Sequence, residues 1–556
     1  MLVVLFAACS DTAMPESRRP ADLAVTNARV WTGDPTRPWA EALAVRGDSI
    51  VVVGSAAEIA PHLGPDTKVI DAAGGLVTPG FVDSHVHFLE GGFRLSSVQL
   101  RDAASRAEFT ARIAAFAREV PAGAWIVGGD WDHELWGGEL PSRDWIDAVT
   151  PEHPVWVNRL DGHMALANTR ALESAGVDVG AGSGAEPPAT PGGEIVRDAA
   201  GRPTGVLKDN AMDLVARVVP VPAPELQDRA LEAAMRHVAA QGVTTVHHMG
   251  TPEDLAVFER ARAAGRLRTR IYAAVPLDTW ERLERHVAER GRGDAWLRTG
   301  LLKGFVDGSL GSHTAAFFEP FTDAPGDRGL LVNFEEDLRA WIEAADAAGL
   351  HVTVHAIGDR ANALLLDLYA GAIAKNGARD RRFRAEHAQH LRPQEVPRFA
   401  ELGVIPSMQP YHAIDDGRWA DRVIGAERAK GTYAFRSLLD AGARLTFGSD
   451  WFVAPPTPLE GIYAALTRRT LDGAHPDGWV PEQRIELEEA LRAYTSSGAY
   501  ASFEEDSKGA LRPGMLADLV VLDRDLFAVA PEAVRDARVV ATVVGGEVVR
   551  TRAGTR

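Results

Sequence analysis

The chain has 556 residues, which exceeds a typical single domain, so we expect one large domain and one accessory domain. Hydrophobic residues make up 46% of it, and its 53 glycines and 33 prolines are spread along the chain, a composition typical of a globular protein without long disordered stretches. A formal net charge of −18 argues against a nucleic-acid partner, because phosphate binding requires clustered Lys and Arg.

The only cysteine is Cys9, so the sequence allows no intramolecular disulfide and offers no thiol ligand to a metal. The apolar residues 1–8 end in small side chains just before Cys9, and this segment resembles a bacterial lipoprotein signal. We therefore predict a lipoprotein signal and a disordered linker over residues 1–21, lipidation at Cys9, export and membrane attachment. The alternative is a cytoplasmic protein whose apolar N-terminus is disordered. No other stretch approaches about 18 consecutive apolar residues, so a transmembrane helix is not expected.

Both ends of the chain have the pattern of short β-strands. Residues 22–80 contain short alternating segments such as 23–30, separated by Gly, Asp and Pro. Residues 508–556 repeat this pattern, for example at 517–523. We expect a small β-structure at each end, and it needs no catalytic role.

An HxH pair, His85 and His87, ends the first long apolar segment. Side chains alternate along a strand with a period of two, so both imidazoles project from one face and can bind one metal ion. A chelating pair on a helix would instead be spaced i and i+4. The alternative for each residue is a buried histidine with satisfied hydrogen bonds, so the assignment depends on partners later in the chain.

The stretch between His87 and Gly242 is far too long for one connection, since loops between strands and helices usually span roughly 2 to 6 residues. We therefore predict an inserted subdomain over residues of about 95–235. Two strand-like segments within it end in polar and aromatic residues that we expect to form pocket walls; these are Trp131, Asp132 and His163.

Four further residues with metal-binding chemistry follow or lie within short apolar segments: Lys303, His355, His387 and Asp450. From His355 to His387 is 32 residues, which fits one strand–helix–strand step of roughly 30 residues. From His387 to Asp450 is 63 residues, which fits two steps, with residues 403–409 as the strand between them.

Counting back from Asp450 as the end of the eighth strand places His387 on the sixth strand and Lys303 on the fourth. Residues 242–247 and 269–275 can form the second and third strands, and the HxH pair then ends the first. The count closes at eight, which predicts an α/β fold, a (β/α)8 TIM-like barrel over residues 81–507. Such barrels carry their chemistry at the carboxyl ends of the strands, where all these side chains would lie.

The order HxH, Lys, His, His, Asp resembles the metal pattern of the amidohydrolase superfamily. More narrowly, segments 77–87, 161–168, 303–312 and 489–495 resemble the amidohydrolase 3 family, which includes N-substituted formamide deformylases. The resemblance covers residues of about 22–550. It implies a metallo-hydrolase barrel whose two chain ends, 22–80 and 508–556, form one composite β-sandwich. His313 departs from the family pattern, because many members have Arg there, so a role in binding a substrate carboxylate is not carried over.

Lys303 cannot bind a cation in its usual state, because an ammonium group has no lone pair and a reference pKa near 10.4 keeps it charged. In relatives of the superfamily the neutral amine reacts with CO2, and the resulting carbamate bridges two metals. The resemblance therefore implies a carboxylated Lys303 in a binuclear site. The alternative is a Lys303 that pairs with a carboxylate such as Asp307 and leaves a single metal.

We therefore expect one or two Zn²⁺ ions, other divalent metals remaining open, in a site that lowers the pKa of bound water toward about 7. Asp450 would be both a ligand and the group that takes the proton of water and returns it to the departing nitrogen. The predicted metal ligands are His85, His87, Lys303, His355, His387 and Asp450. The predicted catalytic residues are Asp450 and His163.

Around the metals we expect a small-molecule substrate. His163 and Asp132 would hold the substrate or the oxyanion, and Asp307 is a further candidate contact. Trp131, Trp136 and Trp451 would line an apolar pocket, with core packing as the alternative for each. Of His247 and His248, we expect one to face the mouth of the barrel.

The function that follows is hydrolysis of a C–N bond in an N-acyl or N-formyl small molecule. A cyclic amide hydrolase or a deaminase would need the same metals, and a lipid-anchored binding protein without catalysis is a distant alternative, because a fold does not guarantee activity. The sequence leaves substrate, metal count and oligomeric state open.

Overall fold

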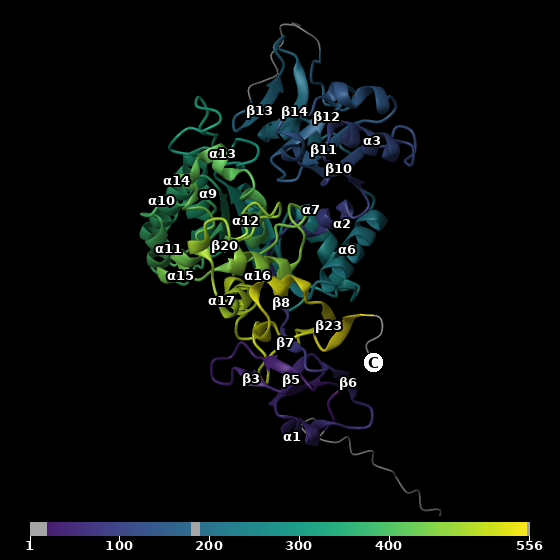
Figure 1. Ribbon diagram of the computed structural model, residues 1–556, viewed down its shortest axis with the longest axis vertical. Helices are drawn as coiled ribbons and strands as arrows, with labels where there is room; N and C mark the ends of the chain where they lie inside the picture. The colour runs from purple at the N-terminus through teal and green to yellow at the C-terminus, as the bar shows by residue number, and fades with distance from the viewer. Residues whose placement is uncertain (1–18, 180–189, 553–556) are drawn as a thin grey trace, which may run out of the picture.

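The computed structural model describes residues 19–179 and 190–552. Three parts follow one another along its long axis: a β-sandwich at one end, a barrel in the middle and an inserted subdomain at the other end (Figure 1). This arrangement confirms the predicted fold class. Cys9 and most of the predicted signal segment lie outside the described residues, so lipidation stays a prediction. No helix in the described ranges is both long and apolar enough to cross a membrane.

The β-sandwich contains two sheets built from both ends of the chain. Both sheets share one apolar core, to which Val25 and Leu43 contribute from the N-terminal end, and Leu519 and Val543 from the C-terminal end. One sheet has the order β5 (Ser49–Gly54), β4 (Ala42–Arg46), β1 (Leu23–Thr26), β6 (Lys68–Asp71). The other has the order β24 (Glu547–Thr551), β23 (Val539–Val544), β22 (Leu519–Leu522), β7 (Leu76–Pro79), β2 (Arg29–Trp31), β3 (Trp39–Ala40).

The barrel sheet has eight strands in chain order, all of them parallel. Every segment that the sequence predicts as a barrel strand is one. They are β8 (Phe81–Val86), β15 (Val243–Met249), β16 (Arg270–Pro276), β17 (Leu297–Phe305), β18 (His351–Ala356), β19 (Arg384–His387), β20 (Ile405–Met408) and β21 (Thr446–Phe447).

The first and last strands meet just beyond the short β21. The amide of Asp450 donates to the carbonyl of His85 over 2.7 Å, and the amide of His87 donates to the carbonyl of Trp451 over 2.6 Å. Gly448 permits this approach, because a Cβ there would lie 2.6 Å from the backbone nitrogen of His85. The closure of the barrel therefore places the HxH pair directly beside Asp450.

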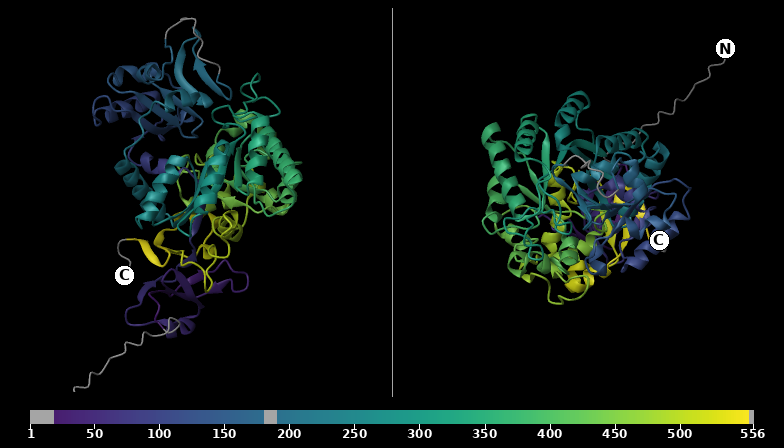
Figure 2. Two further views of the ribbon diagram at one scale, coloured as in Figure 1. Left: turned by 180° about the vertical axis from the view of Figure 1, so that it is seen from behind. Right: turned by 90° about the horizontal axis from the view of Figure 1, so that it is seen from above.

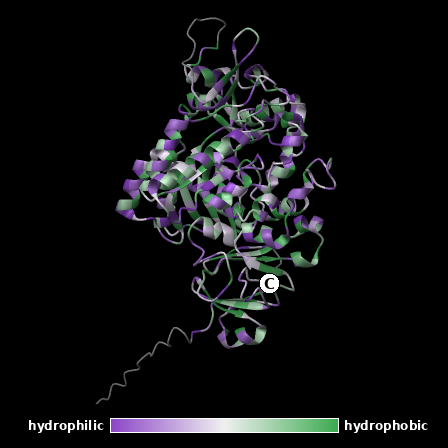
Figure 3. Cartoon of the chain, turned by 90° about the vertical axis from the view of Figure 1, so that its left-hand side faces the viewer, coloured by the Kyte–Doolittle hydropathy of each residue, from purple (hydrophilic) through white to green (hydrophobic). Residues whose placement is uncertain are grey.

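Helices surround the barrel, as the views from behind and from above show (Figure 2). In α6, the buried residues Leu231, Ala234, Met235 and Val238 recur at helical spacing and face the sheet. Coloured by hydropathy, the outer helices alternate between hydrophilic and hydrophobic residues, as this packing requires (Figure 3). The main helices are α2 (Phe88–Arg94), α6 (Pro224–Ala239), α7 (Pro252–Ala263), α8 (Trp280–Arg290), α9 (Glu335–Ala347), α10 (Asp359–Asn376), α11 (Val396–Leu402), α12 (Pro410–Asp416), α13 (Ala420–Ile424), α14 (Ala426–Ala429), α15 (Phe435–Asp440), α16 (Pro458–Thr467), α17 (Leu487–Ala493) and α18 (Ser496–Ala501).

The inserted subdomain leaves the barrel after β8 and returns before β15. Its helix α3 (Arg106–Ala117) packs on the sheet through Phe109 and Ile113. Two short helices, α4 (Thr169–Ser174) and α5 (Asp213–Ala216), complete it. The sheet has the order β13 (Gly193–Arg197), β14 (Pro203–Asp209), β12 (Met164–Ala167), β11 (Val155–Arg159), β10 (Ile126–Trp131), β9 (Val98–Gln99).

A buried ion pair joins the barrel to the sandwich. Arg270 on β16 makes two bonds to Asp518, with Nε 2.6 Å from Oδ2 and NH2 2.9 Å from Oδ1. Both side chains are almost fully buried. Asp518 also accepts the backbone amide of Gly545, so this carboxylate ties the C-terminal strands to the base of the barrel.

Candidate metal centre

A cavity of about 290 Å³ opens at the carboxyl ends of the barrel strands. Barrel residues form its floor, and residues that follow β10 and β11 of the inserted subdomain form one wall. All six predicted metal ligands line it, together with Asp132 and His163. The residues that the sequence predicts to lie together therefore line one cavity.

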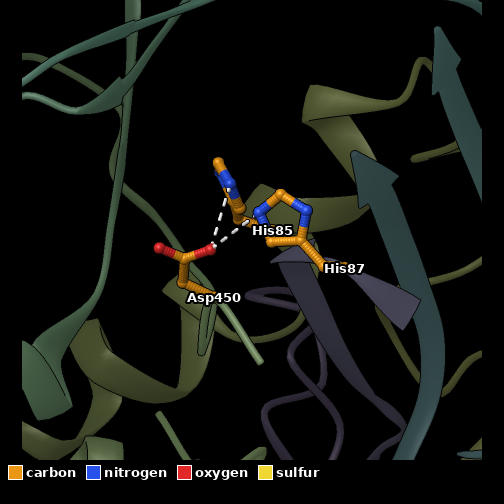
Figure 4. Close-up of side chains that lie close together, drawn as sticks. All are labelled: His85, His87 and Asp450. Atoms are coloured by element: carbon orange, nitrogen blue, oxygen red, sulfur yellow. Dashed lines mark ion pairs between the residues drawn. The ribbon is translucent and has the colours of Figure 1, made fainter. Parts of the chain in front are cut away.

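His85, His87 and Asp450 form a group with metal-binding chemistry, since one potential ligand atom of each lies within 4.8 Å of the others. Oδ1 of Asp450 lies 3.4 Å from Nε2 of His85 and 3.3 Å from Nε2 of His87 (Figure 4). This oxygen is buried and has no hydrogen-bond partner. An unsatisfied buried carboxylate oxygen is costly, and a cation between these three groups would satisfy it. The donor set therefore fits a divalent metal.

The protonation states suit metal binding. Burial lowers the pKa of His85 well below its ordinary value, and Lys303 lowers it further, so the imidazole is neutral. Burial opposes ionisation of Asp450, but His85 and His87 outweigh it and lower the pKa of this carboxyl below its ordinary value. A neutral His85 imidazole beside the Asp450 carboxylate is the combination of forms that binds zinc.

Lys303 extends the group at the floor of the cavity. Its Nζ lies 3.3 Å from Nε2 of His85 and 4.8 Å from the centre of the Phe305 ring. Burial lowers the pKa of Lys303 to about 8, although Glu386 and Asp450 oppose the shift. The neutral amine, which is the form that reacts with CO2, is therefore more accessible here than in a solvated lysine.

His387 and His355 continue the site away from His85. The ring centre of His387 lies 4.9 Å from that of His85 and 4.5 Å from that of His355. Nδ1 of His387 bonds the amide oxygen of Gln409 over 2.8 Å, which leaves Nε2 free. Nε2 of His355 bonds the carbonyl of Gly308 over 2.9 Å, which leaves Nδ1 free. Each ring thus keeps one nitrogen for a ligand role.

Glu386 and Gln409 orient these imidazoles, and sequence reasoning missed both. Glu386 lies 2.5 Å from Nδ1 of His85 and 2.7 Å from Arg384, and it also accepts the hydroxyl of Thr353. A carboxylate on the outer nitrogen of a ligating histidine fixes the tautomer that turns Nε2 to the metal. The sequence did contain a signal for both residues, because Glu386 immediately precedes His387 and Gln409 ends the seventh predicted strand segment.

Two predicted ligands have a backbone conformation that is uncommon for residues other than glycine. The φ angles are +72° at His387 and +59° at Asp450. Such strained positions cost on the order of 1 to 3 kcal/mol and cluster at functional sites. The surrounding barrel therefore holds these two side chains in the cavity against a local preference.

His163 approaches the row of histidines from the inserted subdomain, with its ring centre 4.8 Å from that of His355. Its Nδ1 lies 2.6 Å from Asp209, at the end of β14. Burial opposes protonation of His163, but the pKa is raised overall because Asp209 and Asp161 stabilise the cation. Asp209 escaped the sequence analysis, since no spacing links it to His163.

His412 is a cavity residue that the sequence did not reveal. It lies on α12, three residues after Gln409, and its Nε2 is buried with no hydrogen-bond partner in the described chain. Burial lowers its pKa. The ring is therefore neutral and can hydrogen-bond a bound molecule.

Several expected pocket residues lie elsewhere. Trp131 is fully buried in the core of the inserted subdomain, stacked on Trp136, and its indole N–H donates to the carbonyl of Val157. Trp451 is buried against Gly91 and stacks on His237 of α6. Packing, the alternative considered for each Trp, is what the structure shows, and none of the three lines the cavity.

Asp307 is also displaced from the cavity. Its carboxylate accepts the backbone amides of Ala316, Ile357 and Gly358, so it organises the loops behind His355 and has no face toward a substrate. It does not pair with Lys303. Burial raises the pKa of Asp307 to about 7, which these three bonds oppose.

Neither His247 nor His248 lines the cavity, and both side chains are buried. Nδ1 of His247 faces Arg384 in the barrel interior at 2.9 Å, and Nδ1 of His248 accepts the amide of Phe88 over 2.9 Å. His313 lies outside the cavity lining and pairs with Asp323 at 3.0 Å.

Comparisons with known proteins agree with this site. The model of the amidohydrolase family matches residues 68–550. The chain is 41% identical to Protein LONG AFTER FAR-RED 3 of Arabidopsis thaliana, covering 95% of this chain and 91% of that protein. It is 30% identical to an N-substituted formamide deformylase of Arthrobacter pascens, covering 96% and 99%.

A solved structure of an uncharacterized metal-dependent hydrolase from Pyrococcus horikoshii is similar throughout, with a TM-score of 0.73 and 28% identity, covering 92% of this chain and 99% of that one. The family match, the eight-strand barrel and the clustered ligands agree with one another. The chain therefore belongs to the amidohydrolase family and is a metal-dependent hydrolase that acts on carbon–nitrogen bonds.

Proposed function

We propose that this protein is a zinc hydrolase that cleaves the C–N bond of an N-formyl or N-acyl small molecule, with a carboxylated Lys303 in a binuclear site. The observation that carries the proposal is the buried, unpartnered Oδ1 of Asp450 beside Nε2 of His85 and His87. The 30% identity to a formamide deformylase supports the choice of bond.

His85, His87 and Asp450 would hold one ion, and His355, His387 and the carbamate of Lys303 would hold the second. When bound, such ions polarise a carbonyl group and lower the pKa of water. Asp450 takes the proton of the attacking water and delivers it to the leaving nitrogen, which departs as a neutral amine. His163, held by Asp209, donates a hydrogen bond to the oxygen on which negative charge develops.

The zinc-loaded protein should hydrolyse N-formyl amines, and an assay with N-formyl, N-acetyl and cyclic amides of the same amine tests this. Release of the free amine is followed by its reaction with an amine-specific dye. Turnover confined to the cyclic amides would replace the proposal with a cyclic amide hydrolase. No turnover at full metal occupancy would support a binding protein.

In this proposal, the number of metal ions bound per chain depends on Lys303. We expect two zinc ions per chain in the wild type after loading in bicarbonate buffer, and about one in Lys303→Ala, because the carbamate that would hold the second ion is lost. Elemental analysis of the desalted protein gives the stoichiometry, and ¹³C-bicarbonate labelling should give a carbamate NMR signal in the wild type alone.

Chelation of the metal with dipicolinate should abolish hydrolysis of the N-formyl amine, and added zinc should restore it.

Lys375→Ala is the matched control, because this exposed lysine on α10 pairs only with Glu343 on the surface. It should retain two ions and the carbamate signal. Two ions in Lys303→Ala would contradict the proposed role of Lys303 in holding the second ion while leaving a zinc hydrolase intact.

A further inference from the structure

Arg159 lies in the cavity wall, and its guanidinium is already neutralised. NH1 lies 2.7 Å from Oδ2 of Asp161, NH2 lies 3.6 Å from Oδ1 of Asp132, and Nε donates to the ring of His133. The side chain is almost fully buried. It therefore supports the loop that carries His163, and a ligand would have to compete with these partners for its guanidinium.

Arg418, which the barrel contributes just after α12, is likewise paired with carboxylates of the protein. Its NH2 lies 3.2 Å from Oδ2 of Asp132 and contacts the carboxylate of Asp415, and its Nε donates to the carbonyl of Asp415 over 2.9 Å. Asp132 thus bridges both arginines and links the inserted subdomain to the barrel. Each arginine already has carboxylate partners within the protein, and a substrate carboxylate would have to displace them.

Away from the metal group, acidic side chains outnumber basic ones around the cavity. Lys303 and Asp450 belong to the metal group, whose charge includes that of a bound ion. Among the other described residues that line the cavity, the cationic side chains are Arg159, Arg418 and His163, whose pKa is raised. The carboxyl groups are Glu90, Asp132, Asp161, Asp415 and Asp416, and burial raises the pKa of Asp416 to about 7. Glu90 is about half exposed and has one partner, Arg94, so it remains accessible to a cation.

Apolar side chains complete the wall. Phe305 and Leu310 lie on one side, and Phe452 and Val453 follow Asp450 on the other. Outside the metal group, a bound molecule therefore meets hydrocarbon surface and an excess of carboxyl groups, in a partly desolvated space where like charges repel strongly.

We infer that the enzyme selects substrates whose nitrogen substituent is uncharged or cationic, and that it discriminates against N-acylated amino acids. The inference rests on the proposed function and specifies its substrate class. A carboxylate next to the scissile amide would face Asp132 and Asp415, and it would find each guanidinium already occupied. An aryl or alkyl amine would bury its substituent against the apolar wall, and an ammonium group would be attracted to Glu90.

Three formamides that differ in one group on the carbon beside the nitrogen test this: N-formyl-2-phenylethylamine, its derivative with an added aminomethyl group, and N-formylphenylalanine in both enantiomers. We expect kcat/KM for the first two to exceed that for N-formylphenylalanine at least tenfold. Equal or faster turnover of either N-formylphenylalanine enantiomer overturns the inference.

Asp132→Asn should reduce the ratio of kcat/KM between N-formyl-2-phenylethylamine and N-formylphenylalanine at least threefold, because it removes one carboxylate from both arginines. Asparagine keeps the N-terminal cap of the turn at residues 133–136. Glu134→Gln is the control, since Glu134 pairs with Arg422 outside the cavity lining and should leave the ratio unchanged. An unchanged ratio in Asp132→Asn would show that paired arginines do not set the preference.

If no formamide is hydrolysed, the proposed function fails, and the charge preference is then judged by binding alone. Calorimetry with the zinc-loaded protein should show tighter binding of 2-phenylethylamine than of phenylalanine. Equal affinity, or no binding of either compound, overturns the inference independently of catalysis.

Discussion

Asp450→Asn should lower kcat about 1,000-fold or more, because in the proposed mechanism one oxygen of this carboxylate completes the metal group and the same carboxylate would move the proton. Asparagine keeps the shape but can neither accept a proton near neutral pH nor supply a negative charge to the cation. Turnover of an N-formyl amine and elemental analysis of the purified variant measure the two roles separately.

Asp440→Asn is the matched control, since Asp440 is exposed on α15 and pairs only with Arg436 on the surface. Its kcat and zinc content should equal those of the wild type. If Asp450→Asn keeps its zinc but loses kcat, proton transfer dominates. An Asp450→Asn protein with wild-type kcat would contradict the assignment of this residue to either role.

Asp518→Ala should lower the free energy of unfolding by about 3 to 5 kcal/mol, because it leaves the buried guanidinium of Arg270 without its two bonds. It also removes the acceptor of the Gly545 amide. Urea unfolding followed by tryptophan fluorescence and circular dichroism measures the loss.

Glu335→Ala removes an exposed pair with Arg339 on α9 and should cost at most about 0.5 kcal/mol. If both variants lose the same small amount of free energy of unfolding, the Arg270–Asp518 pair between barrel and sandwich does not stabilise the fold. A large loss in Asp518→Ala together with full zinc occupancy would locate the effect at the base of the barrel and away from the metal group.

The barrel could be predicted because its strands and ligands repeat at intervals that a sequence displays directly. The 32 residues between His355 and His387 span β18, α10 and β19, and the 63 residues to Asp450 include β20, which carries no predicted ligand. The shared face of the HxH pair on the first strand could be predicted from the sequence alone, because the period of a strand fixes which side chains lie on the same face.

Residues whose role depends on contacts between distant segments could not be predicted. Trp131 ends a strand, but a register shift between Gly128 and Trp131, with φ of +56° at Asp130, turns its ring into the core. The hydrogen bond that Arg418 donates to Asp132 joins positions 286 residues apart, and no local pattern indicates it. The alternation rule fails at a bulge, and spacing carries no information on ion pairs between subdomains.

The antiparallel pairing of β7 with β22 affects how the chain reaches its native state. Roughly 440 residues separate the two strands, so at a synthesis rate of about 5 to 20 residues per second the edge of β7 waits about 20 to 90 s for its partner. During that interval an apolar strand with unpaired backbone groups is exposed to other chains. We therefore expect nascent-chain aggregation, more than loss of native contacts, to limit the yield of this protein at high expression rates.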